Sequence, residues 1–208
     1  MIDRRLFLTL SGGLAAYSIP GPAGAVDPSG LIATLVGKAS ARGADVERVL
    51  AQGGQVQVGE LLQTSAESRL SVKFGPRTVI NLGPSTKLRI EKYLADAGGE
   101  FELVEGSIYY EHPRRFTDAP QKTVVRSPYG LLAVRGTKFF AGPSQDDEFA
   151  VFVAEGRVDV IAEGDTVVLH PGFGSGIRRR GSKPSKAAKW PPARVSQALF
   201  TTIARRAP

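Results

Sequence analysis

The sequence predicts an all-β fold, made of short strands and hairpins in a solenoid-like or double-layered β roll and followed by a basic tail. Three observations support this prediction. Between residues 31 and 177, apolar and polar residues alternate with a period of two, as along strands with one buried face. Glycine or proline interrupts the alternation about every eight to twelve residues, which is typical of turns between short strands. Helical spacing of apolar residues is nearly absent there.

Residues 1–25 are expected to be a cleaved export signal, so they are set aside from the fold. Residues 3–8, Asp-Arg-Arg-Leu-Phe-Leu, resemble the twin-arginine motif of proteins that are exported already folded. The moderately apolar run that follows, residues 6–19, is shorter than the roughly 20 residues that span a bilayer. Small residues at 23–25, Ala-Gly-Ala, provide a cleavage site. We therefore expect a soluble periplasmic protein whose signal is cleaved near Ala25.

The strands of the main domain, residues 26–177, fall into two groups. Alternating segments with one charged face are residues 55–58, 69–74, 87–93, 101–104, 107–110 and 157–160. Continuously apolar segments, expected as central strands covered on both faces, are residues 123–125, 131–134, 149–153 and 166–169. Glycine and proline pairs separate these segments and supply the turns. Periodicity alone leaves a sandwich, a barrel and a short solenoid open.

The charge of the chain is divided unevenly along its length. The 27 Lys and Arg residues exceed the 20 Asp and Glu residues, which gives a net charge of +7. Residues 26–176 hold 16 basic and 19 acidic side chains, however, and are slightly acidic at −3. Residues 177–208 hold nine basic side chains and no acid. The folded domain therefore gives no support from charge for nucleic-acid binding, which we exclude.

Five segments resemble the FecR domain family. Residues 58–74, VGELLQTSAESRLSVKF, and 78–90, TVINLGPSTKLRI, are similar to its first half. Residues 125–128, VRSP, 133–139, AVRGTKF, and 153–160, VAEGRVDV, are similar to its most specific stretch. The resemblance covers about residues 31–177, and departs locally where Gly-Pro-Arg-Thr replaces the commoner Asp-Gly-Thr turn. A proline still suits a turn at that place.

The resemblance implies a periplasmic β-rich domain that receives a signal from an outer-membrane receptor. FecR regulators also have a cytoplasmic anti-sigma segment and a membrane anchor, where this chain has the expected export signal. We therefore expect a stand-alone secreted member, acting as a sensing or scaffold module in the cell envelope. It would bind a protein partner, for example by strand addition at an open sheet edge. The alternative is a module that binds glycans or peptidoglycan, with a hydrolase as a third hypothesis.

Two groups of residues are candidates for binding within the main domain. Arg135, Gly136 and Thr137 lie in the family-like stretch, where the arginine could hold a carboxylate or phosphate. Alternatively, Gly136 marks a bend in a strand and Arg135 pairs with an acid on a neighbouring strand. The glycan hypothesis needs exposed aromatic rings, and its candidates are Tyr109, Tyr110 and Tyr129.

Candidate chemistry is otherwise thin, and we expect no enzyme, no metal and no cofactor. The chain has no cysteine and two histidines, His112 and His170, each followed by proline at a strand end, where a surface or turn role is expected. Residues 146–148, Asp-Asp-Glu, lack the spacing of an EF-hand loop and are expected to form a solvated hairpin loop. The glycine-rich residues 172–176 lack the following helix of a phosphate-binding loop, and are expected where the chain leaves its last strand.

Residues 178–208 are expected to form a flexible basic tail. Its composition of Arg, Lys, Ser, Pro and Ala through residue 192 is typical of a linker. Residues 193–206 have the apolar spacing of a short amphipathic helix. The tail could bind an anionic membrane or lipopolysaccharide by charge, or only increase solubility; its electrostatic candidates are Arg178, Arg179, Arg180, Lys183, Lys186 and Lys189. Trp190 could anchor the linker on the domain or at a membrane interface.

Overall fold

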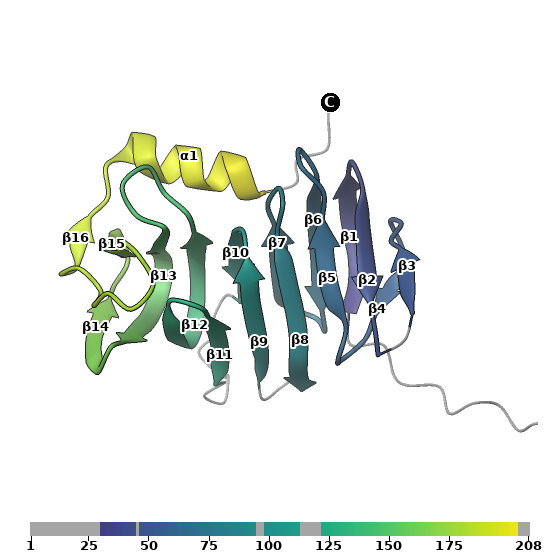
Figure 1. Cartoon of the computed structure of the whole chain (residues 1–208), viewed down its shortest axis with the longest axis horizontal. Coiled ribbons are helices and arrows are strands. Elements are labelled where there is room, and N and C mark those ends of the chain that lie inside the picture. The colour runs from purple at the N-terminus through teal and green to yellow at the C-terminus, as the bar shows by residue number, and fades with distance from the viewer. Residues whose placement is uncertain (1–29, 45, 95–97, 113–121, 204–208) are drawn as a thin grey trace, which may run out of the picture.

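The computed structural model describes residues 30–44, 46–94, 98–112 and 122–203. The expected export signal lies outside these residues. The described residues form one mixed sheet of 16 strands and one helix, α1 (Figure 1). The all-β prediction is therefore confirmed.

The sheet folds back on itself, so that it has two arms that share the long strands β12 (Gly130–Gly142) and β13 (Phe149–Ala162). The first arm continues through β10 (Ile108–Glu111), β7 (Thr78–Leu82), β6 (Arg69–Phe74), β1 (Gly30–Val36) and β4 (Gln55–Val56), and on its other side through β15 (Phe173–Ile177) and β16 (Ala188–Lys189). The second arm continues through β11 (Thr123–Ser127), β9 (Gly98–Glu105), β8 (Lys87–Leu94), β5 (Leu61–Thr64), β2 (Ala39–Arg42) and β3 (Glu47–Val49), and on its other side through β14 (Asp165–Leu169).

A single apolar core lies between the two arms. It takes inward-facing side chains from both, because the period-two pattern of each strand places one set of residues on the inner face. The ring of Phe74, from β6 in the first arm, lies 5.5 Å from that of Phe101, from β9 in the second. Tyr93 on β8 also donates a hydrogen bond of 2.9 Å from its hydroxyl to the Phe74 carbonyl oxygen. These contacts join the arms into a double layer.

The arrangement is a curled mixed sheet and not a solenoid. A β-solenoid stacks parallel strands from successive coils, whereas only the β9–β11 pairing is parallel among the described strands. The other pairings are antiparallel, many of them between the strands of a hairpin. Tight hairpins of this kind follow from the frequent Gly-containing turns.

Two expectations for individual segments are wrong. Residues 166–169 were expected in a central strand, but they belong to β14, which pairs with β13 alone among the described strands. The Gly-rich residues 172–176 were expected after the last strand, but most of them form β15, between β13 and β16. Burial on both faces requires partners from distant parts of the chain, which an apolar run alone does not reveal.

The C-terminal residues continue the fold. Strand β16 pairs with β15, and α1 (Pro192–Thr202) then lies across the upper ends of the strands in Figure 1. The expected short helix is therefore present, but the stretch before it packs on the sheet, unlike the flexible linker expected from composition. In the part of the chain that the structure describes, no helix has the length and apolar character to cross a bilayer.

Candidate binding site

The family-like stretch around Gly136 is the place where β12 passes from one arm to the other. Its register with β13 shifts between Arg135 and Lys138, and Gly136 has a φ of 56°. Gly156, on the facing part of β13, has a φ of 82°, and a Cβ there would collide with the carbonyl oxygen of Gly136. Only glycine combines a positive φ with the absence of a Cβ, so it alone fits this close approach without strain. The bend interpretation of Gly136 therefore agrees with the geometry.

The neighbours of Gly136 differ in their surroundings. Thr137 is fully buried, its carbonyl oxygen accepts a hydrogen bond of 2.9 Å from the His112 N–H, and its hydroxyl has no partner among the described residues. Arg135 is exposed, lies opposite Arg157 in the register, and makes no ion pair among the described residues. The internal acid expected for Arg135 is thus not found there, since Asp159 holds Arg157 instead, at 2.8 Å.

The three candidate tyrosines do not form an exposed row. Tyr109 and Tyr110 are 6% and 2% exposed. Tyr110 lies in the core, where its hydroxyl is 3.1 Å from that of Thr123, and half-buried Tyr129 stacks on Phe149 with ring centroids 5.1 Å apart. Sugar-binding sites need an accessible aromatic face. The glycan hypothesis therefore loses the residues on which it depended.

The histidines and acidic residues form no metal-binding group in the described part of the chain. His112 is buried and not at the surface, and its Nδ1 lies 2.8 Å from the Thr78 hydroxyl. His170 is exposed in the turn after β14. A buried carboxylate does occur at Glu60, which is 8% exposed, but it holds Arg48 with contacts of 2.9 Å and so fastens β3 to the start of β5.

Trp190 is the centre of a second apolar cluster, on the outer face of the first arm. It is 6% exposed, stacks on Phe152 at 5.0 Å between ring centroids, and meets Phe140 at 6.2 Å. Tyr109 and Ala150 complete the buried part of this cluster, and α1 contributes the half-buried side chains of Val195, Ala198 and Leu199. Of the two roles expected for Trp190, anchoring on the domain is the one that the contacts match. We call residues 185–203 the C-terminal strap.

An ion pair fixes the strap to the loop between β12 and β13. Arg194 Nη2 lies 3.2 Å from Asp147 Oδ2 and 3.0 Å from the Ser144 hydroxyl, while its guanidinium carbon is 4.0 Å from the Trp190 ring centroid. The Asp147 side chain is only 14% exposed. The expectation of a solvated loop at residues 146–148 is therefore wrong for Asp147. A charge-assisted contact with stacking on an aromatic face suits arginine better than lysine.

The Gly-rich stretch before the strap makes room for these contacts. A Cβ at Gly174 would collide with the Trp190 ring, and one at Gly176 would collide with the Asp147 carboxylate. Both glycines lie on β15, which forms the floor under the strap. Close approach of another group is a physical reason for glycine within a strand. The stretch therefore has a packing role and no phosphate-binding geometry.

A ladder of hydroxyl groups connects the strap to the turns of the sheet. The Thr64 hydroxyl oxygen accepts from the Thr86 N–H at 2.9 Å, and the Thr86 hydroxyl oxygen accepts from the Ser107 N–H at 3.0 Å. The Ser107 hydroxyl then lies 3.3 Å from that of Thr202, at the end of α1. All four residues are buried. The strap therefore completes a polar network that begins in the FecR-like part of the sequence.

A cavity of about 330 Å³ lies between α1 and the β12–β13 loop. Phe140 and Trp190 line it, together with Ser144, Arg194 and Gln197. Among the described residues that line the cavity, only Arg194 is charged, and its guanidinium already binds Asp147. The cavity thus lacks the convergent, unsatisfied polar groups that identify a ligand site.

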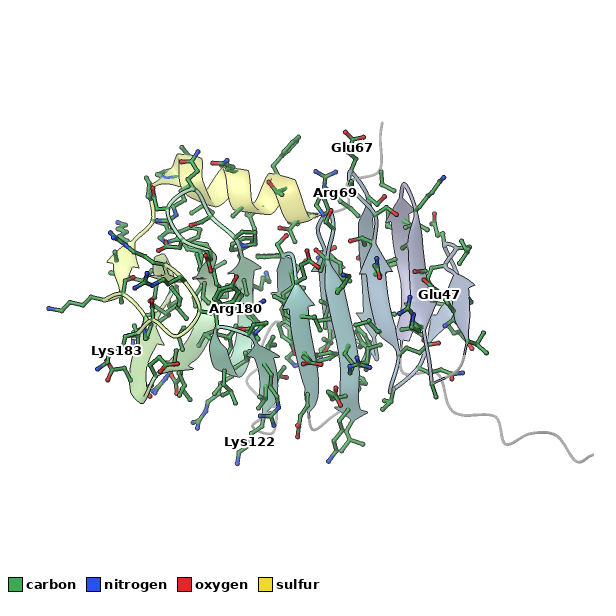
Figure 2. The ribbon with its side chains drawn as sticks, viewed as in Figure 1. Glu47, Glu67, Arg69, Lys122, Arg180 and Lys183 are labelled. Atoms are coloured by element: carbon green, nitrogen blue, oxygen red, sulfur yellow. The ribbon has the colours of Figure 1, made fainter. Side chains whose placement is uncertain are left out.

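The basic residues of segment 178–189, which overlaps the start of the strap, lie at the surface. Arg178, Arg179, Arg180, Lys183, Lys186 and Lys189 are all exposed, so they are available for electrostatic contacts. Lys183 lies 3.2 Å from Asp165 on β14, and the Arg180 guanidinium is 5.6 Å from the Tyr129 ring centroid. Both residues lie at the end of the molecule that carries β14 and β15 (Figure 2). The segment 178–189 is therefore an exposed basic stretch that contacts β14 through Lys183.

Burial changes the acidity of one aromatic residue under the strap. Desolvation, followed by the nearby carboxylates of Glu111 and Glu155, raises the pKa of Tyr109 to about 12. Burial also raises the pKa of Tyr110 above its ordinary value. Neither residue ionises near neutral pH, so neither can act as a base there.

Comparison with known families gives the same assignment as the motifs. Residues 60–159 match the family described as FecR protein. This chain carries a FecR domain. Its matched region runs from the buried Glu60 to the end of the β12–β13 crossing, and the strap lies beyond it.

The fold of the FecR domain also occurs among solved structures. Two crystal structures, at 1.65 Å and 2.50 Å, are of a Parabacteroides distasonis ATCC 8503 protein described provisionally as an anti-sigma factor. Both match with a TM-score of 0.54 and 21% identity over 67% of this chain. The match spans 64% and 63% of those chains, which is less than two thirds of their length. Among curated proteins, no match is found.

The residues that sequence reasoning missed are those of the strap contact, above all Asp147 and Arg194. One signal was present, because Trp190 is the single tryptophan of the chain and lies in a segment otherwise rich in Lys and Pro. A large aromatic residue in such a segment favours burial against a distant surface.

Proposed function

We propose that this FecR-domain protein is a signal-transduction module of the cell envelope that works by binding a protein partner and not by catalysis. The FecR match supports a signalling role, and the neighbour described as an anti-sigma factor is consistent with it. The observation that carries the proposal is the pair of strand edges at the two outer limits of the second arm, β3 and β14, which have no partner strand among the described residues. Such edges are surfaces on which a partner strand can pair.

The polar groups of the interior support binding over catalysis. Glu60 is occupied by Arg48 and Asp147 by Arg194, while the buried hydroxyls of Thr64 and Thr86 bond to backbone groups and that of Ser107 lies against the Thr202 hydroxyl. A catalytic acid, base or nucleophile has to face a site that a substrate can reach. These groups instead hold turns, strands and the strap together.

The proposed place of action is the periplasm. The basis is the twin-arginine-like residues 3–8 and the Ala-Gly-Ala site at 23–25. Sequencing the N-terminus of the exported protein should give Val26 as its first residue, and replacing Arg4 and Arg5 by lysine should stop export. Exported protein that still begins at Met1 would contradict the proposal.

The test of the function is covalent cross-linking in intact cells of the native host, followed by identification of the cross-linked protein. We expect one envelope protein to be cross-linked and to bind the purified chain directly and saturably. The expression of the genes that depend on this partner should change when the chain is deleted. If no protein partner is cross-linked while peptidoglycan fragments raise the melting temperature of the purified chain, the glycan alternative replaces the proposal.

A further inference from the structure

Strand β14 has one unpaired side whose geometry can be worked out from its hairpin. Glu163 and Gly164, with φ of 48° and 77°, form a two-residue turn between β13 and β14. Positive φ at both turn residues is the type I′ geometry, in which the closing pair is hydrogen-bonded. Alternation along the antiparallel pair then leaves the N–H and C=O groups of Thr166 and Val168 facing away from β13.

This edge lacks the devices that usually protect an unpaired strand. Protection comes from proline, bulges or charged side chains. The β13–β14 register runs without a shift, the strand contains no proline, and its single charged residue, Asp165, lies at the hairpin end beside Lys183. Across from Thr166, Ile161 is 37% exposed and provides apolar surface next to the edge. The middle of β14 is thus open to pairing.

The edge of β3, at the other limit of the second arm, is different. Hydrogen bonds from the N–H groups of Leu50 and Gly43 fix its alternation, so that Glu47 and Val49 face away from β2. This strand has only three residues, and hydrogen bonds from Arg42 and Ser40 hold the pKa of Glu47 below its ordinary value. The charged carboxylate protects this edge, which makes β3 a matched comparison for β14.

Charge indicates which partner β14 would accept. Lys183 contacts Asp165, which places this part of the basic segment 178–189 beside the hairpin end of the strand. Arg178, Arg179, Lys186 and Lys189 make no ion pair among the described residues. Like charges would repel a basic strand, while carboxylates on an incoming strand would reach these groups.

We propose that β14 accepts an extended acidic segment of a protein partner as an added strand, with Arg178, Arg179, Lys186 and Lys189 binding its carboxylates. The inference rests on the proposed function and names the surface and the chemistry of the partner. Backbone hydrogen bonds to Thr166 and Val168 provide the pairing, and the basic segment selects acidic sequences. Nucleic acid and phospholipid carry negative charge too, but offer no backbone for the strand.

The test uses the full chain and a short synthetic peptide in which Val and Thr alternate with Glu, with a second peptide that carries Lys in place of Glu. We expect the Glu peptide to bind, the Lys peptide not to bind, and the affinity for the Glu peptide to fall as salt is raised. Vesicles containing phosphatidylglycerol form a third arm.

Proline at an edge position removes one outward donor without touching the hydrogen bonds to the neighbouring strand. Thr166→Pro should weaken Glu-peptide binding about tenfold, as expected for a lost backbone hydrogen bond and the accompanying steric clash. Thr166→Val keeps the donor and should bind as the parent does. Val49→Pro makes the same change on the β3 edge and should have no effect. Replacing Arg178 and Arg179 by glutamate tests the charge without altering the edge.

Equal loss in Thr166→Pro and Val49→Pro, unchanged binding in Thr166→Pro, or absence of Glu-peptide binding would overturn the inference. Vesicle binding that the Glu peptide cannot displace would also overturn it, because the basic segment would then serve a membrane surface. Thermal unfolding of each variant checks that the fold is kept, and if Thr166→Pro does not fold, Val168→Pro removes the other outward donor of the same edge and takes its place. If the cross-linked partner binds Thr166→Pro as tightly as it binds the parent, the partner does not pair with β14, whereas the proposed function stands.

Discussion

Removing the indole of Trp190 should destabilise the whole domain, because the strap is part of the fold. The ring is 6% exposed and stacks on Phe152 at 5.0 Å, with the Arg194 guanidinium 4.0 Å from its centroid. A buried aromatic ring replaced by alanine costs about 3 to 5 kcal/mol, and the lost cation–π contact lies within about 0.5 to 2 kcal/mol. If the strap leaves the sheet before the sheet unfolds, the loss cannot exceed the free energy with which the strap docks. We therefore expect Trp190→Ala to lower the free energy of unfolding by about 3 kcal/mol.

Urea denaturation followed by far-ultraviolet circular dichroism measures this loss, and the m-value shows whether the strap has already detached from the native state. Phe200→Ala is the matched control, since Phe200 lies on the same helix but is 68% exposed and should change stability by at most about 0.5 kcal/mol. A loss below about 1 kcal/mol in Trp190→Ala, no larger than that of the control, would mean that the strap does not stabilise the domain. The strap would then be the flexible tail that its composition predicts.

Three further predictions concern the crossing, the covered face and the buried tyrosine. Gly156→Ala should cost about 2 to 4 kcal/mol in urea denaturation, because it combines positive φ with a collision at Gly136, whereas Gly164→Ala has positive φ in open space and should cost about 1 kcal/mol. Equal losses would show that the crossing is not tightly packed. Ending the chain after Ile177 should uncover the cluster under the strap and increase fluorescence of the dye ANS; unchanged fluorescence would mean that the face is not apolar. Because the pKa of Tyr109 is raised from 10 to about 12, the folded state holds a proton that the unfolded state loses, so stability should fall as the pH rises from about 10 toward 12. Tyr109→Phe should reduce this fall, and an identical pH profile would contradict the assigned pKa.

Most of the sheet could be predicted from local pattern. Alternation over residues 69–74 and 87–93 corresponds to β6 and β8, because each strand has one face in the core and one toward solvent. The bend at Gly136 was also among the sequence interpretations, since glycine within a strand indicates a bulge or a close approach. These features depend on residues next to one another in the chain.

The strap could not be predicted in the same way, because its partners are distant in sequence. Trp190 packs on Phe140 and Phe152, and Arg194 binds Asp147 at a separation of 47 residues. Composition alone indicated a linker, since Lys, Arg, Ser and Pro dominate residues 178–192. The apolar run at 166–169 could not be placed correctly for a related reason. Its pattern does not show whether a strand pairs on one side or on both, and β14 pairs only with β13 among the described strands.

Amide hydrogen exchange at single-residue resolution can show whether a partner strand pairs with β14. In the free chain the outward N–H groups of Thr166 and Val168 should exchange rapidly, like those of Glu47 and Val49 on the other edge. On addition of the glutamate peptide, Thr166 and Val168 should become protected from exchange while Glu47 and Val49 should not. Saturating binding that leaves Thr166 and Val168 unprotected would contradict this pairing.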